Sequence, residues 1–316
     1  MNKTGTENLG DKRFSAAPVY LSDLGACTPA SSLSPESRRG HWRTLPYETD
    51  ERSGVMLIAG TETAAPNVTY PLGLSGWHAV SFGVFGGYYE PDQVLVRLSG
   101  DDTFTNLRVQ QHDTTAWYRQ YAGEPIWETF WRVVDLTGQD IVIGQNTWRI
   151  SQGEGPASHR SAEAMLAYIK VVPLSDDELA GHRADLARTE NRRLFTHNDA
   201  GTIGAGTTTA EELRRAVDAY RDSDFARIYW EAGSGDSLNY FSKIGVSPPH
   251  GNVQDLTRES ERISWLSWRS FRDQGIDPFG VVADYAREIG LEFHGGYRVS
   301  GFNYPPPYDH AIQGPS

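Results

Sequence analysis

The sequence predicts a multidomain chain, in which an all-β sandwich of jelly-roll type precedes part of an α/β barrel of TIM type. Three observations carry this prediction. The 316 residues exceed the usual size of one domain, so two are expected. Between Gly54 and Leu174 about eight short β-type runs are separated by turn residues. After Leu174, strand-like runs alternate with amphipathic helices, as in parallel α/β folds.

Composition narrows the possible partners. The net charge of -12 and the pI near 5.2 argue against nucleic acid and anionic membranes, because an acidic surface repels phosphates. The chain has 9 Trp, 15 Tyr and 32 Gly, which is common in all-β folds and in carbohydrate-handling proteins, where flat rings meet the C–H faces of sugars. No run has the length of a signal peptide core or of a membrane helix, so location is left open.

Residues 1–53 are polar and lack a sustained period, so we expect an irregular lead-in without functional residues. Residues 54–174 are expected to form the sandwich. In QVLVRL the alternating Val94, Val96 and Leu98 point one way. The other expected strands are VMLIAG (55–60), NVTYPL (67–72), HAVSFGVF (78–85), FTNLRVQ (104–110), IWETFWRVVDL (126–136), DIVIG (140–144) and AMLAYIKVVPL (164–174).

A charged linker helix is expected over 175–190, where Ser175 and Glu178 have the spacing of a capping box. Residues 191–316 are expected to form the N-terminal part of a (β/α) barrel. The predicted strands are 192–201, 225–233 and 291–302, and the predicted helices are 208–223, roughly 257–273 and 277–290. Thr209 with Glu212 marks one helix start, and Asp277 with Pro278 another.

A closed barrel needs eight strand–helix units, whereas this pattern supplies three strands. We therefore expect the sequence to be a fragment of a longer protein, although a self-contained three-stranded unit is the alternative.

Three tracts, RRLFTHNDAG, IYWEAGSGDSLNYFSKIG and HGGYRVSGFNYPPPYD, are similar to bacterial two-domain glycosyl-hydrolase-like (family-10-like) proteins, in which a jelly-roll precedes a (β/α)8 barrel. The segment AMLAYIKVVPLSDDE likewise resembles the closing strand of galactose-binding-like jelly-rolls. The resemblance covers residues from about 54 to the end. It implies a carbohydrate-active protein that hydrolyses O-glycosidic bonds in its full-length form, with carbohydrate as partner; the alternative is a non-catalytic carbohydrate-binding or structural module.

Glycoside hydrolysis uses two facing carboxylates, and Asp199 and Glu231 each end a predicted barrel strand. The first two strands of a barrel are neighbours, so these carboxylates are the expected catalytic pair. The alternative is structural: Asp199 bonds to its loop, and Glu231 pairs with an Arg or a loop amide.

Polar and aromatic residues near the same strand ends are expected to bind substrate. They are His197, Asn198, Trp230, Asp236, His294, Tyr297 and Arg298. Because strand side chains alternate, only one of Tyr229 and Trp230 points into the barrel. Arg298 is a candidate for an anionic group or for an ordinary ion pair.

No metal or cofactor is expected. The glycine-rich GTIGAG and GSGD lack the features of phosphate or dinucleotide loops, and no HExxH or GxSxG pattern occurs. His197 and His294 lack a tight ligand spacing. In the first domain Trp77, Trp127, Trp131 and Trp148 are interpreted as core residues, with a sugar-binding face as the alternative.

Overall fold

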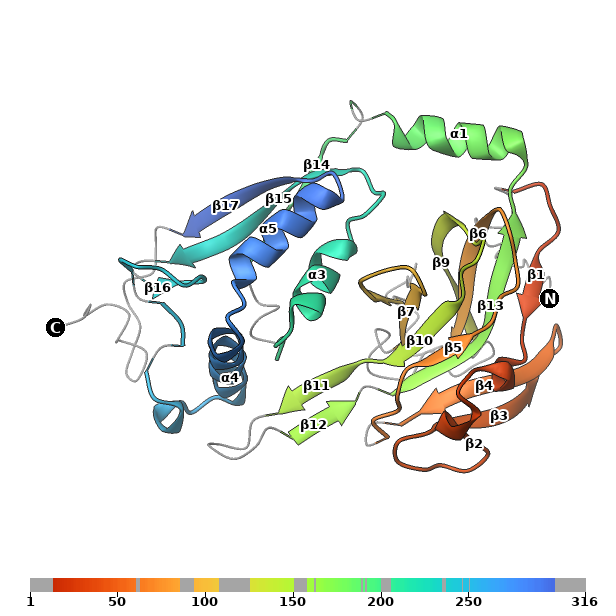
Figure 1. Ribbon diagram of the computed structural model, residues 1–316, viewed down its shortest axis with the longest axis horizontal. Coiled ribbons are helices and arrows are strands. Elements are labelled where there is room, and N and C mark those ends of the chain that lie inside the picture. Colours follow the sequence, from red (N-terminus) through yellow and green to blue (C-terminus); the bar gives the residue numbers. More distant parts are fainter. Residues whose placement is uncertain are drawn as a thin grey trace, which may run out of the picture. The chain divides into compact units, whose positions relative to one another are not determined.

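The computed structural model describes residues 14–60, 63–85, 94–107, 126–150, 158–161, 163–188, 190, 192–199, 206–234, 237–245, 247–249 and 251–298. They form two compact units. The first contains the described residues of Met1–Asp101, Asn106–Asn146 and Ser161–Ala187, and the second those of Asp102–Thr105, Thr147–Arg160 and Arg188–Ser316. This is a β-rich, multidomain chain with several sheets and few helices (Figure 1).

The main sheet of the first unit has seven strands in the order β2-β3-β4-β13-β6-β9, with β1 paired to β13. All its neighbouring pairs are antiparallel except β2–β3. The strands are β1 (Val19–Leu21), β2 (Leu33–Ser34), β3 (Trp42–Glu48), β4 (Ser53–Ala59), β6 (Trp77–Phe85), β9 (Ile126–Asp135) and β13 (Ala164–Pro173).

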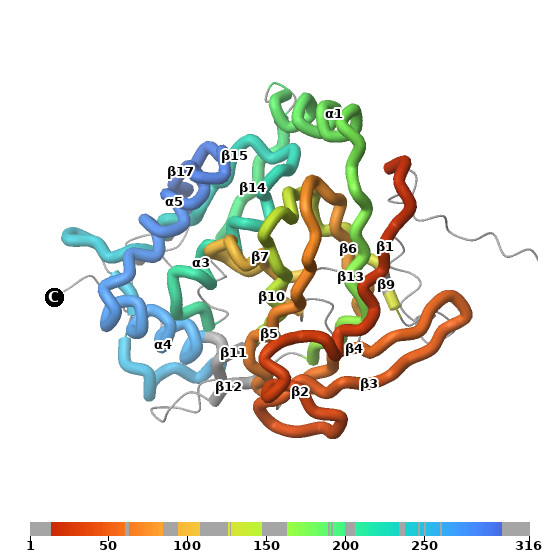
Figure 2. Tube along the Cα trace, turned by 45° about the vertical axis from the view of Figure 1, so that its right-hand side comes forward, coloured from red at the N-terminus to blue at the C-terminus, as the bar shows by residue number. Residues whose placement is uncertain are grey.

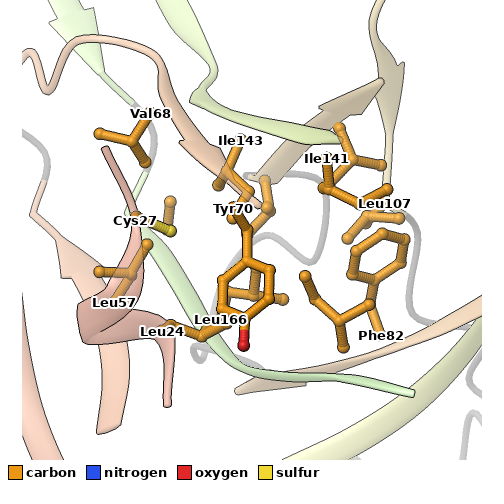
Figure 3. Close-up of a cluster of buried hydrophobic side chains, with 14 of the residues drawn as sticks. Leu24, Cys27, Leu57, Val68, Tyr70, Phe82, Leu107, Ile141, Ile143 and Leu166 are labelled. Atoms are coloured by element: carbon orange, nitrogen blue, oxygen red, sulfur yellow. The ribbon is translucent and has the colours of Figure 1, made fainter. Parts of the chain in front are cut away.

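A second sheet has the order β5-β10-β7-β8. Its strands are β5 (Val68–Tyr70), β7 (Val94–Leu98), β8 (Thr105–Asn106) and β10 (Ile141–Gln145). Side chains of both sheets meet in one core, in which Phe82 of the first sheet lies near Ile141 of the second (Figure 3). Val94, Val96 and Leu98 are all buried there, as their alternation predicts. The strand connections of a jelly-roll remain a prediction.

The single cysteine, Cys27, belongs to this core. Burial, with a smaller effect from the nearby Asp23 carboxylate, raises the pKa of the Cys27 thiol to about 12. The thiolate is the reactive form of cysteine, so this side chain is inert at neutral pH.

The expectation of an irregular lead-in over 1–53 is wrong from Val19 onward. Val19 pairs with Val171, and β3 and β4 form a hairpin between β2 and β13 of the main sheet (Figure 2, red to orange). Trp42 is fully buried and its indole N–H donates to the Pro66 carbonyl. The period was hidden because β3 carries large residues on both faces with polar residues between them: Trp42 faces the core, and Tyr47 packs on the opposite side.

That opposite side of the main sheet buries charge. Lys170 is 3 % exposed, and its Nζ lies 2.8 Å from a Glu128 carboxylate oxygen. The Tyr168 hydroxyl donates to the other oxygen of Glu128 at 3.2 Å. The Arg52 guanidinium lies over the Tyr20 and Tyr168 rings, 3.6 and 4.5 Å from their centroids. Aromatic rings and an ion pair therefore cover this face together.

Helix α1 (Asp176–Leu186) is the last element of the first unit and begins with the predicted capping box. The Ser175 hydroxyl accepts from the Glu178 N–H, and the Glu178 carboxylate accepts from the Ser175 N–H. The Ser175 N–H and hydroxyl, with the Ser15 N–H, donate to the Glu178 carboxylate and lower its pKa to about 2. In the part of the chain that the structure describes, no helix has the length and apolar character needed to cross a membrane.

The second unit has the predicted alternation of strands and helices. Its elements are β14 (Leu194–Asn198), α3 (Ala210–Asp218), β15 (Phe225–Ser234), β16 (Ser237–Leu238), the short η5 (Val253–Asp255), α4 (Glu259–Gln274), α5 (Pro278–Glu288) and β17 (Glu292–Arg298). β15 pairs in parallel with β14 on one side and β17 on the other, and β16 returns antiparallel against its end. A separate two-stranded sheet joins β11 (Thr147–Ile150) and β12 (Ser158–Ser161). Among the described residues no barrel is closed.

Both helix starts occur where the sequence predicts them. Thr209 and Glu212 form the capping box of α3, and Pro278 is the first residue of α5 after Asp277, which makes no side-chain cap hydrogen bond.

Helices α3 and α5 lie on one side of the parallel strands (Figure 1). Their apolar side chains meet Ile228 and Trp230 of β15 in a buried cluster to which Trp268 and Phe271 of α4 also belong. We call this side of the sheet the helix-covered face.

A polar network joins α3 to α5 within this layer. The Tyr285 hydroxyl donates to the Asp218 carboxylate at 2.6 Å, and Arg221 contacts both Asp218 at 2.8 Å and the Tyr285 oxygen at 2.7 Å. Burial, followed by the hydrogen bond to Asp218, raises the pKa of Tyr285 to about 12.

Candidate functional site

The other side of the parallel sheet carries aromatic and charged residues in register. Phe195, Arg227 and Glu292 form one row across β14, β15 and β17, and His197, Tyr229 and His294 form the next. Glu231 and Gly296 follow toward the carboxyl ends of β15 and β17. Side chains two residues apart on a strand share a face. We call this side, which includes Arg298, the open face, because Phe195 is 65 % exposed on it.

Glu231 lies at the carboxyl end of the central strand and is 7 % exposed. One of its carboxylate oxygens is 2.8 Å from an Arg298 guanidinium nitrogen. That oxygen has the distance of an ion pair but not the geometry of a hydrogen bond to any described residue. The sequence left a catalytic and an ion-paired Glu231 open, and the structure shows the ion pair.

The backbone around Glu231 is irregular. Glu231 pairs with Gly296 and Gly233 with Tyr297, so Ala232 is an extra residue in β15. Such a bulge bends the strand and re-aims the neighbouring side chains. The chain then folds back: the Asn239 side-chain amide donates to the Glu231 carbonyl at 3.2 Å, and the Asn239 N–H donates to the Ala232 carbonyl at 2.8 Å. These two hydrogen bonds from Asn239 therefore hold the backbone of Glu231 and Ala232 in place.

Three rings stand side by side across the strands. Tyr229 stacks on His294 with centroids 5.0 Å apart, and its other neighbour Phe195 meets it edge-on at 5.7 Å. Phe195 and His294 therefore both contact the Tyr229 ring. The Phe195 side chain is left 65 % exposed on this face.

Two consecutive glycines of β17 face opposite sides of the sheet, and the space is tight at Gly295 but ordinary at Gly296. A Cβ at Gly295 would lie 3.3 Å from Phe279 Cζ on the helix-covered face. A Cβ at Gly296 would lie 3.8 Å from His197 Nε2 on the open face. His197 therefore reaches across β15 to a point beside the residue that pairs with Glu231, which places an imidazole and a carboxylate in one neighbourhood.

Several predicted site residues do not belong to this group. Trp230 is 1 % exposed and lies in the helix-covered cluster, so the expectation that it contacts substrate is corrected: Tyr229 occupies the open face instead. Asn198 pairs with Trp230, and Tyr297 alternates with Arg298, so both side chains point to the side of the sheet opposite the open face, where Tyr297 is 52 % exposed. Asp199 is exposed just after β14, and Asp236 lies outside the described residues.

Sequence reasoning missed Phe195, Arg227, Glu292 and Gly296. Alternation in LFTHN contains the signal for Phe195, since it lies two residues before His197. Arg227 and Glu292 form an ion pair at 3.3 Å, and Glu292 also lies 3.4 Å from His294 Nε2. Within the described ranges no cluster of three or more His, Cys, Asp or Glu side chains has the arrangement of a metal site.

Comparisons with known proteins complete the description. No protein-family model and no curated protein matches the chain. Similar solved structures include a calcium-binding mutant of Bacteroides uniformis beta-glucuronidase 2, at 9 % identity over 50 % of this chain and 18 % of that chain, with a TM-score of 0.26. The catalytic domain of a GH87 alpha-1,3-glucanase in complex with tetrasaccharides matches at 12 % identity over 71 % of this chain and 37 % of that chain, with a TM-score of 0.25. These weak structural neighbours are glycoside hydrolases, this chain spans less than two fifths of each, and a likeness of this size establishes neither family nor activity.

Proposed function

We propose that the chain is a carbohydrate-active protein and that the open face is its carbohydrate-binding surface. The observation that carries the proposal is that an exposed aromatic ring, Phe195, and the ion pair of Glu231 and Arg298 lie on the same face of one sheet. Sugars present apolar C–H faces to rings, and their hydroxyls both donate and accept hydrogen bonds. Carboxylate and guanidinium groups provide the complementary acceptors and donors.

The fold predictions belong to the same proposal. We propose that residues 54–174, together with the strands that precede them, form a galactose-binding-like jelly-roll, that 175–190 link the units, and that 191–316 form the N-terminal part of a TIM-type barrel. In such a barrel the open face would be the interior wall. Ligands bind there at the carboxyl ends of the strands, where Glu231 lies.

In its catalytic form the proposal assigns hydrolysis of O-glycosidic bonds to a protein in which further strand–helix units complete the barrel. Asp199 and Glu231 are the carboxylate pair. A separation of about 5 to 5.5 Å would predict retention of configuration at the anomeric carbon, and about 6.5 to 9.5 Å would predict inversion. His197, His294 and Arg298 would position the sugar.

A non-catalytic binding module is the second candidate. The observation in its favour is the contact of 2.8 Å between Glu231 and Arg298, because an acid catalyst must be able to deliver a proton, whereas an ion-paired carboxylate serves as an acceptor.

The test measures binding and hydrolysis of a polysaccharide panel by this chain, by an extended chain, and by their Glu231→Gln variants. Glu288→Gln, on the exposed surface of α5, is the matched control. We expect Glu231→Gln to lower glycan affinity at least about tenfold and to abolish sugar release by the extended chain, whereas Glu288→Gln changes neither. Absence of binding to every glycan would refute the proposal. Binding without sugar release would leave the binding module.

A further inference from the structure

We infer that the open face selects uncharged glycans over acidic ones, and that Glu231 sets this selection by neutralising Arg298. The inference rests on the proposed function, since it assigns a substrate class to the same surface.

The arginines of the open face are both paired with carboxylates. Arg298 lies 2.8 Å from Glu231, and Arg227 lies 3.3 Å from Glu292. Each guanidinium thus has its own carboxylate, and the two pairs together carry no net charge. An acidic sugar bound here would meet a carboxylate for every guanidinium that it approaches.

Arg298 and Glu231 differ in how far their side chains are exposed. The Arg298 side chain is 53 % exposed, whereas that of Glu231 is 10 % exposed. Solvent reaches the guanidinium more readily than the carboxylate, so a ligand meets Arg298 first. The buried negative charge beneath it is held by the bulged end of β15 and stays in place when a ligand arrives. Its charge therefore offsets the attraction that an unpaired Arg298 would exert on a carboxylate or a sulfate.

The net charge of the chain also acts on ligands at long range. The chain carries a net charge of -12, which lowers the local concentration of polyanions near its surface. Neutral sugars do not respond to this field. The local charge pairing and the overall charge therefore favour the same ligand class.

The inference predicts the effect of removing one charge. Glu231→Gln keeps the size of the side chain and leaves Arg298 without its carboxylate, so the affinity for acidic glycans should rise relative to neutral ones. Arg298→Gln leaves the Glu231 charge uncompensated, so the affinity for acidic glycans relative to neutral ones should fall or stay unchanged. Glu288→Gln changes the net charge by the same amount as Glu231→Gln but lies on α5, and it controls for the long-range field.

The experiment uses pairs of glycans that share a backbone and have one neutral and one acidic member: dextran and dextran sulfate, mixed-linkage β-glucan and its carboxymethyl form, and methyl-esterified and free galacturonan. Affinities are measured by calorimetry at pH 8, above the ordinary titration range of histidine, in 0.15 M salt. For the wild type we expect at least about tenfold tighter binding of the neutral member in every pair that binds. In Glu231→Gln this preference for the neutral member should fall at least about tenfold, and in Glu288→Gln it should not change.

Three results are decisive. Equal or tighter binding of acidic members by the wild type, or an unchanged ratio in Glu231→Gln, overturns the inference and leaves the proposed function intact. Failure of every member of every pair to bind overturns the proposed function itself. If circular dichroism shows that Glu231→Gln does not fold, Arg298→Gln decides: retained neutral binding with weaker acidic binding supports the inference, and stronger acidic binding overturns it.

Discussion

The main sheet of the first unit and the parallel sheet of the second unit differ in how they cover their faces. The first buries one face in the shared core and the other under aromatic rings, where the Lys170–Glu128 pair has side chains that are 4 % and 13 % exposed. The second buries its helix-covered face and leaves residues of its open face, such as Phe195, exposed. On its open face the Arg227–Glu292 pair is 42 % and 60 % exposed.

The buried and the exposed ion pair therefore have different roles. A buried pair has exchanged water for its partner and stabilises the fold only while both members stay. An exposed pair contributes little to stability and keeps the freedom to exchange hydrogen bonds with a ligand. A binding site is therefore expected on the sheet that leaves a face open.

The sharpest test compares the two faces of the parallel sheet. Trp230→Ala removes a large side chain from the helix-covered cluster, so the free energy of unfolding should fall by about 3 to 5 kcal/mol. Phe195→Ala, on the open face, should change it by no more than about 0.5 kcal/mol. Urea unfolding followed by circular dichroism measures both. Equal losses would mean that the open face is covered, and the comparison would fail.

A slightly smaller effect is expected when the buried and exposed ion pairs are compared. Lys170→Met should lower the free energy of unfolding by about 3 kcal/mol, because it leaves the Glu128 charge in a buried position without its lysine. Arg227→Met, the matched change on the open face, should cost less than about 1 kcal/mol. The double variant Lys170→Met/Glu128→Gln should regain part of the loss. A small effect of Lys170→Met would show that the buried pair is solvated.

The smallest effect concerns the network between α3 and α5. Tyr285→Phe removes hydrogen bonds to Asp218 and Arg221 and should lower the free energy of unfolding by about 1 to 2 kcal/mol. The pKa of Tyr285 is about 12 in the folded chain, against about 10 for tyrosine in an unfolded chain. The folded state therefore binds more protons between these values.

The resulting contribution to stability is complete below pH 10 and decreases as the pH rises toward 12. Tyr168, whose pKa burial also raises, acts in the same direction in the first unit. The measurement is therefore the difference between wild type and Tyr285→Phe across pH 9 to 12. If the two pH profiles are parallel, Tyr285 does not have the proposed linkage.

Much of the fold was predictable from local patterns. Turn residues separated the strands of the first unit, and capping boxes at Ser175 and Thr209 marked helix starts that the structure confirms. The strands near the N-terminus were missed because β3 has large side chains on both faces, so its sequence does not alternate between apolar and polar residues. Which strands pair is a tertiary property, and no local pattern indicated that β1 would join β13.

The candidate site was predictable at the level of strands but not of faces. Alternation required that Tyr229 and Trp230 point in opposite directions, yet nothing local to YW indicated which one the helices would cover. The contact between Glu231 and Arg298 depends on the parallel pairing of β15 with β17 and on the bulge at Ala232. Both features arise from long-range packing.

The buried Cys27 has a practical consequence for studying this protein. It is the single cysteine of the chain, and its pKa of about 12 keeps it in the unreactive thiol form at neutral pH. A cysteine introduced at the exposed Phe195 position would therefore take up a maleimide dye in an otherwise wild-type background. One fluorophore would then report directly on ligands that arrive at the open face.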